Sequence, residues 1–278
     1  MGSWTAVQDA EMARAATLPQ ADASSLVDAG NVEAKVKEMY GQVAREEPAE
    51  LHFQVGRPLA EHLGYPSELL DAIPAEALAS FAGAGYHLDL AALAPGGAVL
   101  DLGSGSGTDV FCAAVRVGGA GRVVGVDFTR EQLSKAERLR DRDGFGQVGF
   151  VEASIDQLPF EDATFDAVIS NGVINLSVVK DRVFAEAARV LRPGGRLALS
   201  DIVSGKPLKE RTRRNVELWA ACIAGAIPRR NYVETIEAAG FSVGPLRRNE
   251  YRFVSDRALD ACSTYEVESV SLVAVRSG

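Results

Sequence analysis

From residue 97 onwards, short apolar runs alternate with amphipathic segments, and this alternation allows few folds. The apolar runs lie at 98–102, 122–127, 148–153, 165–170 and 196–202, and helical patterns lie among them at 108–118, 129–142 and 181–191. Continuous apolar strands joined by helices are typical of a parallel sheet that is covered on both faces. We therefore predict an α/β fold with helices on both faces of the sheet.

The C-terminal part departs from this alternation. We expect a helix at 231–240, a strand at 241–246 and a last strand within 265–276. No crossover helix is evident before the last strand, so we expect it to pair antiparallel at the end of the sheet. The complete prediction is a Rossmann-like, mostly parallel, seven-stranded sheet.

Upstream of the sheet, the apolar spacing at 31–44 and the Pro-Ser start at 65–73 indicate helices. We predict three parts: a flexible arm at 1–30, a helical cap or lid at 31–93, and the α/β core at 94–278. Within the core, Thr129 and Gln132 are spaced as a capping box at the start of a helix.

Charge and cysteine content narrow the class of partner. The 278 residues carry a net charge of −9, which argues against nucleic acid and anionic membranes as partners. No apolar run is long enough to span a membrane, and the N-terminus does not resemble a secretory signal. Cys112, Cys222 and Cys262 are scattered and fit neither a disulfide framework nor a zinc site. We expect a cytoplasmic protein that acts on a small molecule and holds no metal, whereas oligomeric state is not predicted.

A glycine-rich loop follows the first predicted strand. Gly103, Gly105 and Gly107 alternate with Ser104 and Ser106, and such residues let the backbone turn tightly and approach a ligand. The dinucleotide fingerprint fails because its third glycine would fall at Thr108, and the Gly-Lys-Ser/Thr of a P-loop is absent. Taken alone, the loop is also compatible with a purely structural turn.

Acidic and aromatic neighbours favour a nucleoside ligand. Asp101 precedes the glycines by two positions, and Asp127 ends the second predicted strand. A carboxylate at the latter position can accept both hydroxyls of a ribose. Phe128, the next residue, offers a flat apolar face for a purine.

Four segments in order resemble the class I S-adenosylmethionine-dependent methyltransferases over residues 97–203: "VLDLGSGSG", "GVDFT", "LPFEDATFDAVIS" and "RVLRPGGRLALSDI". The resemblance implies S-adenosylmethionine as cofactor and S-adenosylhomocysteine as product. It implies that the loop lies under the methionine part, that Asp101 faces the ammonium, and that Asp127 holds the ribose. The full implied set for the cofactor is Tyr40, Asp101, Gly103, Ser104, Gly105, Gly107, Asp127, Phe128, Ser154, Ile155, Asn171 and Gly172.

Further segments, among them "LWAACIAGAI" and "VKEMYGQVA", resemble the arsenite methyltransferases over most of residues 31–240. That family binds trivalent arsenic through cysteine thiolates. Here Ala84 and Gly172 stand at two of the thiol positions, a cysteine pair after the first helix is missing, and only Cys222 remains. The resemblance places Ala84, Asn175, Trp219 and Cys222 in the substrate pocket, and Tyr40 in a segment that folds over the cofactor.

Two histidines lie near the positions that lack thiols. His52 and His87 are the candidate general bases, because an imidazole titrates near neutral pH and can take a proton from an attacking atom. A surface or satisfied core histidine is the alternative for each.

Three functions remain open at this point. The first is methyl transfer to oxygen, nitrogen or carbon of a small organic molecule, in secondary metabolism for example. The second is methylation of arsenite or another thiophile with Cys222 and exogenous thiols. The third is a cyclase or binding module that holds the cofactor without methyl transfer.

Overall fold

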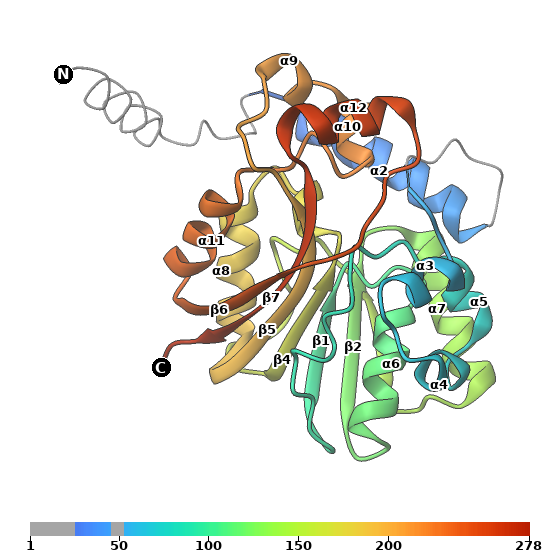
Figure 1. The fold of residues 1–278 in the computed structure, drawn as a ribbon. Helices are drawn as coiled ribbons and strands as arrows, with labels where there is room; N and C mark the ends of the chain where they lie inside the picture. The colour runs from blue at the N-terminus through green and yellow to red at the C-terminus, as the bar shows by residue number, and fades with distance from the viewer. Residues whose placement is uncertain (1–25, 46–52) are drawn as a thin grey trace, which may run out of the picture.

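The computed structural model describes residues 26–45 and 53–278, and it contains one seven-stranded sheet of order β3-β2-β1-β4-β5-β7-β6 (Figure 1). The first five strands are parallel, and β7 is antiparallel to both of its neighbours. The strands are β1 (Ala98–Leu102), β2 (Arg122–Asp127), β3 (Val148–Glu152), β4 (Phe165–Asn171), β5 (Leu191–Val203), β6 (Phe241–Arg248) and β7 (Glu268–Arg276). The predicted α/β, Rossmann-like, mostly parallel sheet is confirmed.

Helices cover both faces of the sheet, because alternate side chains of each buried strand point to opposite faces. On one face, Val99 packs with α6 (Thr108–Val117) and α7 (Arg130–Asp143). On the other face, Leu100 packs with α8 (Lys180–Val190) and α11 (Arg229–Ala238). The two helix layers stand on either side of the strands in Figure 1.

The prediction for the last strand was partly wrong. Strand β7 does pair antiparallel, but it lies between β5 and β6 rather than at the sheet edge. Val270, Leu272 and Ala274 are fully buried in the core on one face of the sheet, as expected for an interior strand. Strand β6 lies at the edge of the sheet instead. It ends in Arg247 and Arg248 and is more exposed than β7. Helix α12 (Asp256–Tyr265), which sequence reasoning missed, precedes β7.

The expected capping box was also wrong. Thr129 is the N-cap residue of α7, but its side chain makes no capping hydrogen bond. The Gln132 side chain instead bonds to Ser106 and to the backbone carbonyl of Tyr40. Tertiary partners therefore outcompete the local pattern at this position.

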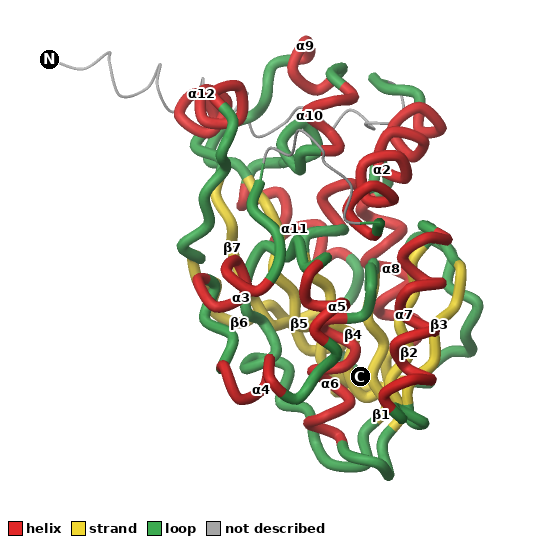
Figure 2. The backbone as a smooth tube through the Cα atoms, turned by 90° about the vertical axis from the view of Figure 1, so that its right-hand side faces the viewer, coloured by secondary structure: helices red, strands yellow, loops and turns green. Residues whose placement is uncertain are grey.

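The segment expected to form one helical cap divides between two places. Helix α2 (Ala29–Ala44) lies at the carboxyl ends of the strands, beside α10 (Val216–Ala220), which in turn contacts α9 (Glu210–Arg213). The short helices α3 (Arg57–His62), α4 (Ser67–Asp71) and α5 (Ala75–Ala79) pack with α6 on one sheet face, as Figure 2 shows from the side. No helix within the described ranges is long and apolar enough to cross a membrane.

Candidate functional site

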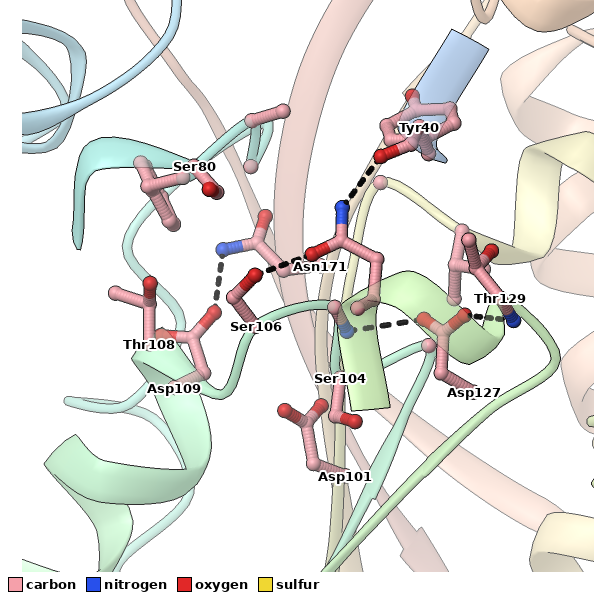
Figure 3. A pocket seen from close by; sticks show the side chains of 18 of the residues that line it. Tyr40, Ser80, Asp101, Ser104, Ser106, Thr108, Asp109, Asp127, Thr129 and Asn171 are labelled. Atoms are coloured by element: carbon pink, nitrogen blue, oxygen red, sulfur yellow. Dashed lines mark hydrogen bonds between the residues drawn. The ribbon is translucent and has the colours of Figure 1, made fainter. Parts of the chain in front are cut away.

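A cleft of about 690 Å³ opens at the carboxyl ends of β1, β2 and β4, beneath α2 (Figure 3). This is the edge of a parallel sheet at which ligands of open α/β folds bind. Its lining combines the glycine loop, three carboxylates and the cover helix: Val36, Tyr40, Ser80, Phe81, Ala82, Gly83, Asp101, Gly103, Ser104, Gly105, Ser106, Thr108, Asp109, Asp127, Phe128, Thr129, Gln132, Asn171, Gly172, Val173 and Leu176.

The path of the loop requires glycine at two positions. Gly103 has φ +72°, and a Cβ there would lie 2.4 Å from Val173 Cγ2. Gly107 has φ +93°, and a Cβ there would lie 2.8 Å from the Phe111 ring. Both conformations are disfavoured for residues that carry a Cβ. Glycine at these two positions therefore allows the backbone to form the floor of the cleft.

The charge of the cleft favours a cationic ligand. Asp101, Asp109 and Asp127 line it, and none of the described lining residues is Lys, Arg or His. Asp101 is only 2% exposed, and burial together with the charges of the other two carboxylates raises its pKa well above its usual range. Asp109 is held by the Tyr65 hydroxyl at 2.5 Å and by Asn171 Nδ2 at 3.0 Å. A bound cation would relieve the repulsion among these carboxylates.

Asp127 is fixed at the end of β2 by two backbone amides. Its Oδ2 accepts from the Gly105 N–H at 2.9 Å and its Oδ1 from the Thr129 N–H at 2.7 Å. Burial raises the pKa of this carboxyl group, and these hydrogen bonds act in the opposite direction. The carboxylate thus joins the glycine loop to the start of α7 and faces the cleft.

A second cavity of about 660 Å³ continues from the first, past Val36, Phe128, Val173 and Leu176, which line both. Ser154 and Ile155 belong to its lining. All the predicted purine-side residues are therefore brought together in one cavity, next to the carboxylate predicted to hold the ribose.

Helix α2 covers both cavities and is held from below by α7. Gln132 Nε2 donates to the Tyr40 carbonyl at 2.9 Å, while Gln132 Oε1 accepts from the Ser106 hydroxyl of the loop. Lys135 Nζ donates to the Ala44 carbonyl at 3.1 Å. Sequence reasoning missed Gln132 as a site residue, since its local spacing pointed to a helix cap.

Three positions distant in sequence meet beyond the loop. A Cβ on Gly172 would lie 3.7 Å from Ala84 Cβ, and Cys222 Sγ lies 3.6 Å from the Gly172 carbonyl oxygen. Asn171 Oδ1 accepts from the Ala84 N–H at 2.7 Å and so fixes the 83–85 turn beside β4. Burial raises the pKa of the Cys222 thiol to about 12, so it is protonated at neutral pH.

The remaining predicted residues lie elsewhere. His87 is fully buried, its two ring nitrogens have no hydrogen-bond partner in the described part of the chain, and it lines neither cavity. Burial lowers its pKa. His52 lies outside the described residues. The four residues predicted for the substrate pocket are buried and line neither cavity: Ala84, Asn175, Trp219 and Cys222.

The chain resembles known methyltransferases in sequence. A family model described as "Methyltransferase domain" matches residues 93–240. An arsenite methyltransferase of Halobacterium salinarum is 38% identical over 199 residues, covering 71% of this chain and 51% of that protein. The human arsenite methyltransferase is 32% identical over 227 residues, covering 76% of this chain and 58% of that protein. The chain thus spans about half the length of the curated relatives it matches.

Solved structures agree on the fold. An arsenic(III) S-adenosylmethionine methyltransferase from Chlamydomonas reinhardtii matches with a TM-score of 0.60 and 31% identity, covering 81% of this chain and 75% of that one. A geranyl diphosphate C-methyltransferase from Streptomyces coelicolor matches with a TM-score of 0.61. At 17% identity, the second match concerns the fold alone.

Proposed function

Because the chain belongs to the methyltransferase domain family and has the class I S-adenosylmethionine-dependent methyltransferase fold, we propose that it methylates oxygen, nitrogen or carbon of a small organic molecule. One observation carries the choice of acceptor. Ala84, Gly172 and Cys222 converge, yet they bring a single sulfur to the place where the arsenite-methylating relatives are expected to bring several. One protonated thiol is a poor site for trivalent arsenic, which prefers several thiolates.

The cleft fits the proposed methyl donor. The carboxylates suit its ammonium and sulfonium charges, and Asp127, which lines the cleft at the end of β2, would accept the ribose hydroxyls. Ser104 lines the cleft with a buried hydroxyl that has no partner among the described residues, which leaves a polar group for the ligand. Phe128 and Ile155 provide apolar contact for the adenine. When bound, the sulfonium supplies an activated methyl group.

The contribution of the chain is orientation and the exclusion of water. Asp101 and Asp127 would hold the two ends of the donor, and the acceptor would lie on the side of Ala84, Gly172 and Cys222. Holding two reactants in line is the largest effect available when the cofactor carries the activation. Val36 and Tyr40 of α2 close the cleft from above. The expected proton acceptor His52 stays a prediction, and His87 does not reach the cleft.

Arsenite methylation with exogenous thiols is the second candidate, because relatives with that activity are 38% identical to this chain. Cys222 would then supply one ligand and added thiols the others. The two candidates differ in the acceptor and share the donor site.

Product analysis separates the candidates. The protein is incubated with S-adenosylmethionine and either a panel of phenols, amines and enols or arsenite with glutathione, and S-adenosylhomocysteine is quantified. We expect turnover with members of the organic panel and little with arsenite. Rapid formation of methylated arsenic would refute the organic acceptor. Release of no S-adenosylhomocysteine in any arm, despite tight donor binding, would favour the cyclase or binding-module alternative.

A further inference from the structure

Two buried residues of opposite charge lie near the acceptor side of the cleft. Lys180, the first residue of α8, is 8% exposed, and Asp201 on β5 is 1% exposed. Neither Lys180 nor Asp201 lines either of the two cavities. A cation at the first position of a helix faces the unfavourable end of the helix dipole, so Lys180 does not stabilise α8 by its charge. The burial of this lysine therefore needs another explanation.

Both charges hold the backbone of one residue. Lys180 Nζ donates to the Asn175 carbonyl at 2.9 Å, and Asp201 Oδ2 accepts from the Asn175 N–H at 2.8 Å. The ammonium also donates to the Ser177 carbonyl at 2.7 Å and lies 5.3 Å from the centroid of the Trp219 ring. Hydrogen bonds to charged groups are stronger than those between neutral groups. The backbone of Asn175 is thus fixed from both sides.

Asn175 in turn fixes Cys222. Its Nδ2 donates to the Cys222 carbonyl at 2.5 Å. Cys222 has φ +61°, a left-handed conformation that is disfavoured for a residue with a side chain. A Cβ on Gly225 would lie 2.1 Å from the Asn175 carbonyl oxygen, so this segment lies directly against Asn175. Such a conformation persists only where the surroundings determine it.

We propose that Lys180 and Asp201 are positioning residues for methyl transfer, which act through Asn175 to hold the Cys222 thiol against Gly172 and Tyr40. Cys222 Sγ lies 3.6 Å from the Gly172 carbonyl oxygen and 3.7 Å from the Tyr40 hydroxyl. The inference rests on the acceptor side proposed above. The network ties that side to the central sheet, and so it sets the distance from acceptor to donor.

The labelling of Cys222 tests the network without any acceptor. The full chain, saturated with S-adenosylhomocysteine, is treated with iodoacetamide, and the alkylation of each cysteine is followed by peptide mass spectrometry. We expect Lys180→Met and Asp201→Asn to raise the labelling rate of Cys222 at least tenfold. Cys112, which is fully buried, should stay protected, and Cys262 serves as the partly exposed reference. Affinity for S-adenosylhomocysteine, measured by calorimetry, should change less than threefold.

Tyr232→Phe is the matched control, because the Tyr232 hydroxyl donates to the same Asp201 Oδ2 at 2.7 Å, and its removal leaves the hydrogen bonds of Lys180 and Asp201 to Asn175 in place. It should leave Cys222 labelling within twofold of the wild type. If a single variant does not fold, Lys180→Met with Asp201→Asn removes both charges together and avoids an unpaired buried charge. Cys222 labelling that stays unchanged in the folded variants, or that rises together with Cys112 labelling, would overturn the proposal. Because no acceptor is used, the result is independent of whether the substrate is organic or arsenite.

Discussion

At the scale of a single residue, Asp127 has a structural role and is also the ribose ligand that we propose. Its carboxylate accepts hydrogen bonds from the Gly105 and Thr129 amides and faces the cleft. Burial alone would favour the neutral form, and the two N–H donors favour the charged one. The group is therefore held in one orientation before a ligand arrives, which lowers the entropy that binding must overcome.

Removal of this carboxylate should weaken donor binding strongly. A hydrogen bond to a charged group contributes about 1.5–3 kcal/mol, so Asp127→Ala should lower the affinity for S-adenosylhomocysteine roughly ten- to a hundredfold or more. Isothermal titration calorimetry measures this. Glu152→Ala, which removes an exposed carboxylate at the end of the neighbouring strand, is the control and should leave the affinity unchanged. Equal affinities in all three proteins would refute the ribose assignment.

A side chain at Gly103 should destabilise the protein. In Gly103→Ala the new methyl group meets Val173 and the residue keeps a left-handed φ, which costs on the order of 1–3 kcal/mol of unfolding free energy. Urea unfolding should show this loss, with weaker S-adenosylhomocysteine binding. Gly146→Ala adds a methyl group in open space and should be neutral. A Gly103→Ala protein as stable as the wild type would contradict the described path of the loop.

At the scale of elements, α2 is held between two neighbours. On one side Gln132 and Lys135 of α7 bond to its last carbonyls, and on the other Lys35 pairs with Glu217 of α10 at 3.2 Å. Gln132 also accepts from the Ser106 hydroxyl of the glycine loop. The Gln132 side chain thus links helix α2, which covers the cleft, to the glycine loop, which forms its floor.

Gln132→Leu, a change of similar volume, should uncouple the cover from the floor. Each lost hydrogen bond contributes about 1 kcal/mol, so we expect roughly tenfold weaker S-adenosylhomocysteine binding. Hydrogen–deuterium exchange over residues 29–44 should become faster. Gln147→Leu, which removes a contact to the Ala114 carbonyl away from α2, should change neither quantity. If exchange in α2 is the same in both variants, the coupling does not exist.

At the scale of the whole molecule, the buried charges of Lys180 and Asp201 make the free energy of unfolding depend on pH. Burial raises the pKa of Asp201 to about 6 and lowers that of Lys180 to about 8. Asp201 binds a proton more readily in the folded state, so its contribution to stability declines as pH rises from about 4 to 6. Lys180 releases a proton more readily in the folded state, so its contribution recovers as pH rises from about 8 to 10.5.

The change in stability from about pH 4 to 6 (the acid limb) and the change from about pH 8 to 10.5 (the alkaline limb) can be assigned to separate residues. Each group changes the free energy of unfolding by up to about 1.4 kcal/mol per pH unit within its own window. Denaturant unfolding between pH 4 and 10 should show that Asp201→Asn flattens the acid limb and that Lys180→Met flattens the alkaline limb. The exposed pair Lys206–Glu266 offers Lys206→Met as a control that should leave both limbs intact. Identical profiles in all variants would show that neither group titrates in these windows.

The sequence by itself determined the sheet and most of the donor side. Strand period, helix period and the glycine loop are local patterns, and the carboxyl ends of neighbouring parallel strands meet at one edge by geometry. Asp101 and Asp127 could therefore be placed near each other from their positions at the ends of two strands, as the structure shows. The position of β7 between β5 and β6 could not be predicted in this way. The order of the last two strands depends on how they pack against the rest of the sheet, and no local pattern in the sequence shows this.

Only the tertiary structure decided which residues surround Cys222. Ala84, Gly172 and Cys222 are far apart in sequence, and Asn175 reaches Cys222 across the fold. His87, expected to face the cleft, turned out to be fully enclosed. Side-chain contacts of this kind depend on how distant segments pack and on which buried polar groups find partners. The spacing of residues along the sequence does not show how distant segments pack. A sequence pattern can therefore identify candidate residues but cannot predict which of them are in contact.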